Sequence, residues 1–418
     1  MSVAANEFGV GLDEIRDAAE QLKGEVVRTP LISATRLSTM LGCDVYLKLE
    51  NQQYTGSFKD RGSYLKLKSL SDEQKRLGVI AMSAGNHAQG VAYHAQRLGI
   101  PATIVMPTTA PFSKVERTRG FGARVVQSGP TIDEAADTAK ELMDQEGLTF
   151  VHPYDDPRIV AGQGTIGLEM MADEPDLDAI IVPIGGGGVI SGTALAATAL
   201  KPGVEIYGVE AELFPSMYQA IHELDATSGG VSIADGIAVK RPGKLNRQVI
   251  DKLVQDIMLV DEPSLENAVA TLADYQKVVA EGAGAAPLAA LTQNRERFAG
   301  KKVGLVICGG NIDTRLLASV MMRGLVREGR LVRLRIDIND APGVLARVSG
   351  LIGENGANIV EVYHQRLFHD VPVRKAEIDA VIETRNANHV REIIDALEAD
   401  GFRTRILSTL SADGPTQA

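Results

Sequence analysis

The feature that most limits the fold of this chain is a regular alternation of short apolar segments and longer amphipathic ones, which begins at Val79. Four apolar runs predict strands, at residues 79–82, 102–106, 124–127 and 149–151. Three segments between them predict helices, at residues 86–98, 113–120 and 132–145, and Ser113 is a suitable N-cap for the second. Because strands alternate with helices of this length in parallel βαβ units, we expect a doubly wound open sheet here.

A second α/β region surrounds this one. Strands are predicted at residues 44–50, 179–183, 205–210 and 303–307, and helices at residues 12–23 and 193–200. In the first of these helices Ile15, Ala18 and Leu22 fall on one face. Two doubly wound units in one chain usually meet at a cleft, and ligands bind there at the carboxyl ends of the strands.

The pattern changes after a basic segment at residues 322–330. Strands are then predicted at residues 332–338, 358–364, 376–384 and 402–406, and helices at residues 344–354 and 387–399. This βαββαβ order is that of the ferredoxin-like type, and a polar tail follows from Ser411. The expected fold class is therefore α/β, with two doubly wound open-sheet domains and a C-terminal ferredoxin-like α+β domain.

Composition limits the compartment and the partners. A net charge of −11 argues against non-specific nucleic-acid binding. The two cysteines, Cys43 and Cys308, are far apart and are expected to be free thiols in a reducing compartment. The histidines form no H-x-x-x-H pair and there is no C-x-x-C, so no metal site is expected. We expect no signal peptide and no membrane partner, and hence a cytoplasmic protein.

Lys59 lies in the run T-G-S-F-K-D-R-G at residues 55–62, at the start of a predicted helix. A lysine amine becomes a nucleophile when burial or nearby positive charge lowers its pKa, and both Arg61 and the helix N-terminus could supply positive charge. Such an amine can capture an aldehyde as a Schiff base, with Phe58 beside an aromatic ring. The alternative is an exposed lysine at a helix start, which is the commoner fate of a single lysine.

Four consecutive glycines, residues 185–188, directly follow the strand predicted at 179–183. Successive N–H groups of such a run can converge on one anion at a helix N-terminus, which suits a phosphate. A lysine for an aldehyde and a nest for a phosphate together indicate pyridoxal phosphate (PLP). Residues 162–167 also fit G-x-G-x-x-G, but without a preceding strand we interpret them as close helix packing.

Two further runs follow predicted strands. The run S-A-G-N-H-A-Q-G at residues 83–90 offers hydroxyl, amide and backbone N–H groups to a carboxylate, whereas His87 alone is interpreted as a structural histidine. Cys308 begins C-G-G-N at residues 308–311 and could point from the strand end into the cleft. The alternative for Cys308 is a small buried apolar residue.

In this order, these runs resemble the fold-type II PLP enzymes, which are similar to the tryptophan synthase β subunit in fold, and among them the threonine ammonia-lyases (threonine dehydratases). The resemblance covers residues of roughly 15–410. It implies that Lys59 carries the cofactor, that Phe58 flanks its ring, that Asn86 bonds its 3′-oxygen and that Cys308 faces its pyridine nitrogen. It implies phosphate binding by Gly185, Gly186, Gly187 and Gly188. It implies substrate binding by Ser83, Ala84, Gly85, Asn86 and His87.

The resemblance also implies domain limits. A large PLP-binding domain is expected at residues 1–68 and 157–325, a small catalytic domain at 69–156, a hinge at 326–330 and a regulatory domain at 331–410. The last resembles an ACT domain, through N-D-A-P-G-V-L at residues 339–345 and G-A-N-I at 356–359. ACT domains commonly pair between subunits and bind amino acids, so we expect a homo-oligomer, dimer or tetramer, with an isoleucine or valine effector near Gly343 and Asn358. A degenerate domain that only assists assembly is the alternative.

Small differences separate the related activities. Threonine synthases and sulfhydrylases resemble G-N-T where this chain has Asn86-His87. Serine racemases have a second serine, the base on the opposite face, where this chain has Ala84, so elimination is expected to dominate. Racemase-like relatives bind a cation through a Glu and an Asp; Glu210 could match the first, but Ser216 stands at the second.

The sequence thus predicts PLP-dependent deamination of L-threonine to 2-oxobutanoate and ammonia, and also of L-serine to pyruvate. In that reaction Lys59 removes the α-proton. Three alternatives stay open: a serine dehydratase, a serine racemase-like enzyme, or a catalytically inactive amino-acid-binding regulatory protein.

Overall fold

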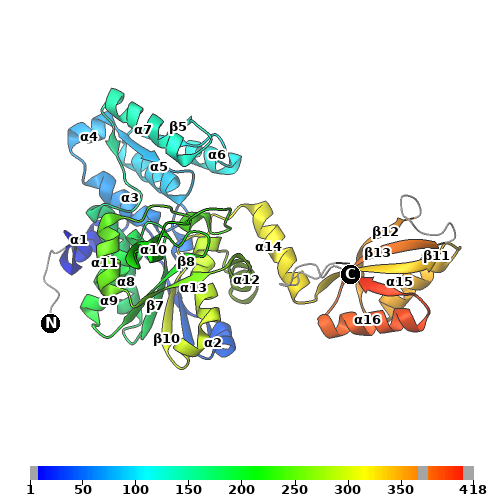
Figure 1. Ribbon diagram of the computed structural model, residues 1–418. Coiled ribbons are helices and arrows are strands. Elements are labelled where there is room, and N and C mark those ends of the chain that lie inside the picture. The colour runs from blue at the N-terminus through cyan, green and yellow to red at the C-terminus, as the bar shows by residue number, and fades with distance from the viewer. Residues whose placement is uncertain (1–7, 366–374, 408–418) are drawn as a thin grey trace. The chain divides into compact units, whose positions relative to one another are not determined.

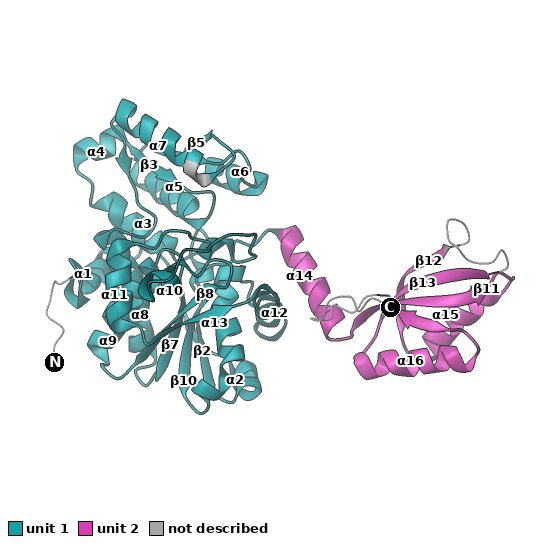
Figure 2. Cartoon of the chain, viewed as in Figure 1, with its two compact units in different colours: residues 1–313 teal, residues 314–418 magenta. Residues whose placement is uncertain are grey.

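The computed structural model describes residues 8–365 and 375–407 (Figure 1). The polar tail predicted from Ser411 lies outside the described residues. The chain divides into two compact units, residues 1–313 and residues 314–418 (Figure 2). In the described ranges, no helix combines the length and the apolar character needed to cross a membrane.

The first unit contains a six-stranded sheet with the order β1-β2-β10-β7-β8-β9. Its strands are β1 (Leu31–Ser33), β2 (Asp44–Lys48), β10 (Lys302–Val306), β7 (Ala179–Pro183), β8 (Glu205–Ala211) and β9 (Asp256–Val260). Neighbouring strands are parallel except β1 and β2, which are antiparallel. Every residue of β7 is buried, as expected for a central parallel strand covered on both faces. No strand was predicted at β1 or β9.

Helices surround this sheet. They are α1 (Leu12–Leu22), α2 (Thr35–Leu41), α3 (Lys59–Lys68), α8 (Pro157–Asp173), α9 (Gly188–Leu200), α10 (Ser216–Ile221), α11 (Lys244–Leu253), α12 (Glu262–Thr271) and α13 (Gly282–Gln293). The face of α1 predicted to be apolar is buried. Helix α9 begins five residues before the helix predicted at 193, because Gly188 already has helical geometry.

The G-x-G-x-x-G run lies within α8, and its interpretation as close helix packing is confirmed. A Cβ on Gly162 would lie 2.7 Å from the Cα of Gly62 in α3, and one on Gly167 would lie 2.6 Å from the carbonyl oxygen of Thr193 in α9. Only glycine lets the three helices approach this closely. The packing brings α3, which begins at Lys59, against the centre of the unit.

A second sheet of the same unit has the order β5-β4-β3-β6 and is parallel throughout. Its strands are β3 (Val79–Met82), β4 (Ala102–Met106), β5 (Arg124–Gln127) and β6 (Thr149–Phe150), and its helices are α4 (Asp72–Leu77), α5 (Asn86–Leu98), α6 (Phe112–Gly120) and α7 (Ile132–Glu146). Ser113 was predicted to be the N-cap of α6, but the structure places Pro111 at that position, with φ −57°. Proline pre-sets a helical φ, so the helix starts earlier than the serine suggested.

The second unit contains α14 (Thr314–Arg327) and a four-stranded antiparallel sheet of order β12-β13-β11-β14. The strands are β11 (Leu331–Asn339), β12 (Asn358–Gln365), β13 (Lys375–Glu383) and β14 (Thr404–Ile406), and the helices are α15 (Val344–Glu354) and α16 (Ala387–Ala399). Alternate residues of β11 and β13 join residues of both helices in one apolar core. The predicted ferredoxin-like order is confirmed. The domain limits stay a prediction; α14 extends into the segment predicted as a hinge.

Candidate active site

Lys59 is the first residue of α3, and its side chain points into the first unit. Its Nζ donates a hydrogen bond of 2.6 Å to the carbonyl oxygen of Pro153 and lies 5.0 Å from the centroid of the Phe58 ring. Burial lowers the pKa of Lys59 to about 8, although Cys308 and Glu281 act in the opposite direction. Near neutral pH the amine is therefore neutral, and hence nucleophilic, far more often than that of an ordinary lysine with a pKa of 10.5.

Arg61 is not what lowers the pKa of Lys59, contrary to the sequence-based interpretation. Its guanidinium donates to both carboxylate oxygens of Glu50, at 2.7 and 2.8 Å, and to both of Glu169, at 2.7 and 2.8 Å. Two carboxylates thus neutralise the charge of Arg61, and desolvation alone activates Lys59.

The loop after β10 contacts the lysine run directly. The backbone N–H of Phe58 donates to the carbonyl oxygen of Cys308 at 3.0 Å, and Ser57 pairs with Gly309 as an isolated bridge. Cys308 is buried, and burial raises the pKa of its thiol well above the usual value. The thiol is therefore neutral near neutral pH.

The run at residues 83–90 places Asn86 at the first position of α5, directly after β3. The Asn86 amide is held at both ends: its Oδ1 accepts from Asn311 Nδ2 at 2.8 Å, and its Nδ2 donates to Glu281 Oε1 at 2.7 Å. Ser83 turns back, and its Oγ accepts the N–H of Gly85 at 3.1 Å. Ala84 is partly buried against the core of the second sheet.

His87 is only half satisfied. Its Nε2 lies 2.9 Å from the carbonyl oxygen of Val151, which can only accept, so we infer that Nε2 carries the proton. Burial, together with Lys59, lowers the pKa of His87 to about 3. Its buried Nδ1 has no partner among the described residues. The hydrogen bond to Val151 agrees with the structural role expected, and the substrate-binding role of His87 stays a prediction.

The glycine run forms a tight cradle at the carboxyl end of β7. A Cβ on Gly186 would clash with the Tyr154 ring, and Gly187 has φ +95°, which strongly favours glycine. Asn246 Nδ2 donates to the carbonyl oxygen of Gly186 at 2.9 Å and so fixes the turn. No side chain caps the N-terminus of α9, which leaves its positive end to an anion.

Three residues of this region were not found from the sequence: Pro153, Asn246 and Glu281. Pro153 acts through its backbone carbonyl, and Asn246 lies in a polar helix, so the sequence pattern marks neither as a site residue. Glu281 does, because it is the only charged residue in the Gly- and Ala-rich run at residues 278–291. A lone carboxylate in a buried helix start usually has a function.

The carboxylate of Glu210 is occupied by backbone hydrogen bonds and is not arranged as a cation ligand. Its two oxygens accept the backbone N–H groups of Met217 and Tyr218, at 2.9 and 2.8 Å, at the start of α10. Over the described ranges, no group of three or more His, Cys, Asp or Glu side chains could hold a metal ion.

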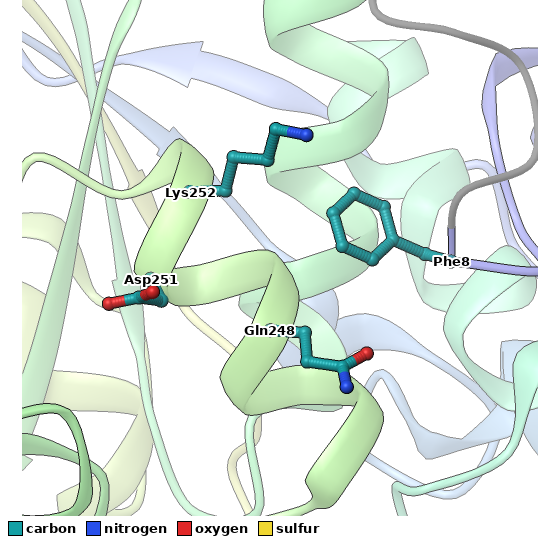
Figure 3. Close-up of a pocket in the computed structure, with 4 residues that line it drawn as sticks. All are labelled: Phe8, Gln248, Asp251 and Lys252. Atoms are coloured by element: carbon teal, nitrogen blue, oxygen red, sulfur yellow. The ribbon is translucent and has the colours of Figure 1, made fainter.

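A surface hollow of about 630 Å³ lies elsewhere on the first unit (Figure 3). It is lined by Phe8, Gln248, Asp251 and Lys252, and Lys252 Nζ lies 5.5 Å from the centroid of the Phe8 ring. None of the residues predicted to bind a ligand lines it.

The two predicted effector residues lie in the second unit. Gly343 is the N-cap of α15, with φ +87°, and is exposed. Asn358 is exposed at the start of β12 and pairs with Glu383.

The residues of the first unit fit pyridoxal phosphate. The cradle at Gly185–Gly188 suits a phosphate, and the amine of Lys59 suits an aldehyde. The two are joined through residues 153–154, because Pro153 accepts from Lys59 while the Tyr154 ring packs on Gly186.

Comparison with known proteins agrees with this geometry. Residues 22–309 match the family described as pyridoxal-phosphate dependent enzyme, and residues 332–402 match the ACT domain. An L-threonine ammonia-lyase of Thermotoga maritima is 45% identical over 95% of this chain and 100% of its own length. Another from Geobacter sulfurreducens is 42% identical over 94% of this chain and 98% of its own length.

Solved structures show the same fold. The processed form of threonine deaminase isoform 2 from Solanum lycopersicum matches with a TM-score of 0.70 and 34% identity, over 77% of this chain and 93% of that one. Maize serine racemase matches with a TM-score of 0.71 and 35% identity, over 76% of this chain and 98% of that one.

Proposed function

Because this chain belongs to the pyridoxal-phosphate dependent enzyme family, we propose that it deaminates L-threonine to 2-oxobutanoate and ammonia. The observation that carries the proposal is the amine of the half-buried Lys59, whose pKa desolvation lowers to about 8 and which is joined to the glycine cradle through residues 153–154. Water leaves across the α- and β-carbons of threonine, and water is taken up again when ammonia is released. Atoms therefore balance between substrate and products.

Pyridoxal phosphate, when bound, delocalises the electron pair that remains when the α-proton of an amino acid is removed. Lys59 holds the cofactor and then, as a neutral amine, takes that proton. The cradle of Gly185, Gly186, Gly187 and Gly188 would hold the phosphate, and Asn86 would donate to the cofactor's 3′-oxygen. Phe58 flanks the ring.

The neutral thiol of Cys308 would face the pyridine nitrogen of the bound cofactor. A thiol with a raised pKa would not transfer its proton to that nitrogen. The substrate carboxylate is bound by residues 83–87 at the N-terminal end of α5.

Ala84 favours elimination over racemisation. A racemase needs a second base on the opposite face of the α-carbon, and a methyl group cannot serve as one. The similarity to maize serine racemase therefore supports the fold and the cofactor chemistry rather than racemisation. L-Serine, whose deamination gives pyruvate, is the second substrate we expect.

The test is a direct assay of the purified chain. With pyridoxal phosphate we expect a yellow protein that forms 2-oxobutanoate from L-threonine. Lys59→Ala should be colourless and lose at least ~10³-fold in rate. Lys68→Ala, in the same helix but exposed, is the matched control and should keep both properties. An active, colourless wild type or an active Lys59→Ala would refute the proposal, and threonine turnover would exclude an inactive regulatory protein.

We propose that the second unit, which matches the ACT domain, binds isoleucine or valine near Gly343 and Asn358 in a homo-oligomer, dimer or tetramer. Both residues are exposed, and neither lies in the apolar core of that unit. Activity and thermal stability measured with and without isoleucine test this, and no change in either would overturn it. The two buried free cysteines support a cytoplasmic location.

A further inference from the structure

Glu281 precedes α13 and is buried, with 4% of its surface exposed, yet its side chain does not cap that helix. Its Oε1 is so close to the backbone of Gly309 that a Cβ there would clash with it, and it lies 3.4 Å from the Cβ position of Gly236. The backbone N–H of Glu281 donates to the carbonyl oxygen of Gly309 at 3.1 Å. The carboxyl group is thus wedged between two loops and is directed at Asn86.

An amide side chain has one acceptor oxygen and two N–H donors. In Asn86 the oxygen is taken by Asn311 Nδ2 at 2.8 Å, and one N–H is taken by Glu281 Oε1 at 2.7 Å. One N–H of Asn86 is therefore left for another acceptor. Asn311 is itself fixed, because its Nδ2 also donates to the carbonyl oxygen of Thr55 at 2.7 Å. The Asn86 amide cannot turn over without breaking both bonds.

Charged groups approach Glu281 from several elements. Asp235, the first residue of a short 3-10 helix (Asp235–Ile237), forms an ion pair with Lys114 of α6, and both act on Glu281. The carboxyl group lies against Gly309, which pairs with Ser57 two residues before Lys59, so its charge also acts on the Lys59 amine. Burial and Asp235 raise the pKa of Glu281 to about 7, against the opposing effects of Asn86, Lys114 and the backbone of Asn311.

We propose that Glu281 is a positioning residue that fixes the Asn86 amide with its remaining N–H offered to the cofactor, and that it also sets the charge environment of Lys59. This proposal rests on the proposed function, since it assumes that Asn86 contacts pyridoxal phosphate. Glu281 acts through Asn86 and needs no contact with the substrate.

The two parts of the proposal can be separated by two substitutions. Glu281→Ala removes both the hydrogen bond and the charge. Glu281→Gln removes the charge but keeps an amide oxygen that can still accept the N–H of Asn86. Glu210→Gln is the matched control: Glu210 is also buried, with a pKa that burial raises to about 7, but its partners are the backbone N–H groups of Met217 and Tyr218.

The first measurement is the equilibrium dissociation constant for pyridoxal phosphate, followed by the protein's absorption spectrum. Loss of a hydrogen bond to a charged group should weaken binding about tenfold or more in Glu281→Ala. Glu281→Gln should stay within about threefold of wild type, and Glu210→Gln should not change. Wild-type affinity in a folded Glu281→Ala would overturn the positioning role.

The second measurement uses the protein without cofactor and follows the reaction of Lys59 with an amine-acylating reagent against pH, by peptide mass spectrometry. A carboxylate at Glu281 stabilises the protonated amine, so both Glu281 variants should reach half-reaction at a lower pH than wild type. Glu210→Gln should not shift. An unchanged Lys59 profile in both Glu281 variants would overturn the electrostatic role. If wild type bound no pyridoxal phosphate, the proposed function would fail, while this profile would still test Glu281.

Discussion

Lys59 and Arg61 lie two residues apart in α3 but belong to two different buried regions. Arg61 lies in an ionic network with Glu50, Glu169 and Lys48, in which Lys48 Nζ also donates to Glu169 at 2.5 Å. Against the effect of burial, Arg61 lowers the pKa of Glu50. Lys59 has no carboxylate within ion-pair distance among the described residues. Its amine donates instead to the backbone carbonyl of Pro153.

The difference shows how one helix turn serves both stability and chemistry. Charges that leave water need partners to stay charged, and the Arg61 region supplies them. In the Lys59 region, the lysine, histidine, cysteine and glutamate all have pKa values moved toward the neutral form. Perturbed, weakly paired groups of this kind are a mark of functional sites. The predictions below test whether pairing is what separates the two regions.

The largest effect is expected at Arg61. Arg61→Met should lower the free energy of unfolding by about 3–5 kcal/mol, because it leaves the buried carboxylate of Glu50 without its main partner. Urea unfolding of the cofactor-free protein measures this. Adding Glu50→Gln should recover part of the loss, since the neutral amide needs no counter-charge. If Arg61→Met alone were as stable as wild type, the ionic network would not be stabilising.

At Lys59, removal of the charged group is expected to raise the free energy of unfolding rather than lower it. Its pKa falls from 10.5 to about 8 on folding, so at pH 7 the protein carries the cost of a buried ammonium. Lys59→Met should therefore raise the free energy of unfolding at pH 7 by up to about 3 kcal/mol.

This gain has a defined pH dependence. Between about pH 8 and 10.5 the unfolded lysine keeps its proton and the folded one has lost it, so wild-type stability recovers as pH rises. The advantage of Lys59→Met should shrink over the same range. Urea unfolding at pH 7, 9 and 10.5 would show this, and a constant difference would contradict it.

A smaller effect is expected in the second unit, where Asp379 accepts from Arg335 at 2.7 and 2.8 Å and from Arg333 at 2.7 Å. These bonds lower the pKa of Asp379. Asp379→Asn should lower stability by roughly 1 kcal/mol, because solvent around the arginines screens the pairs. The stability difference between wild type and Asp379→Asn should be complete above about pH 4. Below that pH it should decrease, because wild-type Asp379 becomes protonated. A difference that grew in acid would refute this.

The smallest effect is expected at the surface. Arg76 pairs with Glu73 at 2.8 Å, and both side chains are about two-thirds exposed. Arg76→Ala should leave the midpoint of thermal unfolding unchanged, since solvent-exposed ion pairs contribute little. A clear shift here would mean that pairing matters independently of burial and would weaken the comparison between Lys59 and Arg61.

Much of the fold could be predicted from local pattern. The strands at residues 79–82, 102–106 and 124–127 and the helix at 86–98 have the predicted limits, because apolar period and glycine or proline breaks define them. The ferredoxin-like unit was predicted for the same reason. Strand β9 and helix α8 were missed; in α8 the glycines that weaken a helix pattern are there to admit neighbouring helices.

The sequence by itself determined most of the elements, the lysine run at a helix start and the glycine run after a strand, since these depend on neighbours along the chain. Only the tertiary structure decided which groups stay charged. Arg61, expected to activate Lys59, is neutralised by Glu50 and by Glu169, 108 residues away, while Glu281 reaches Asn86 across 195 residues. The reason is physical: a pKa is set by burial and by charges a few ångströms distant, and local sequence specifies neither.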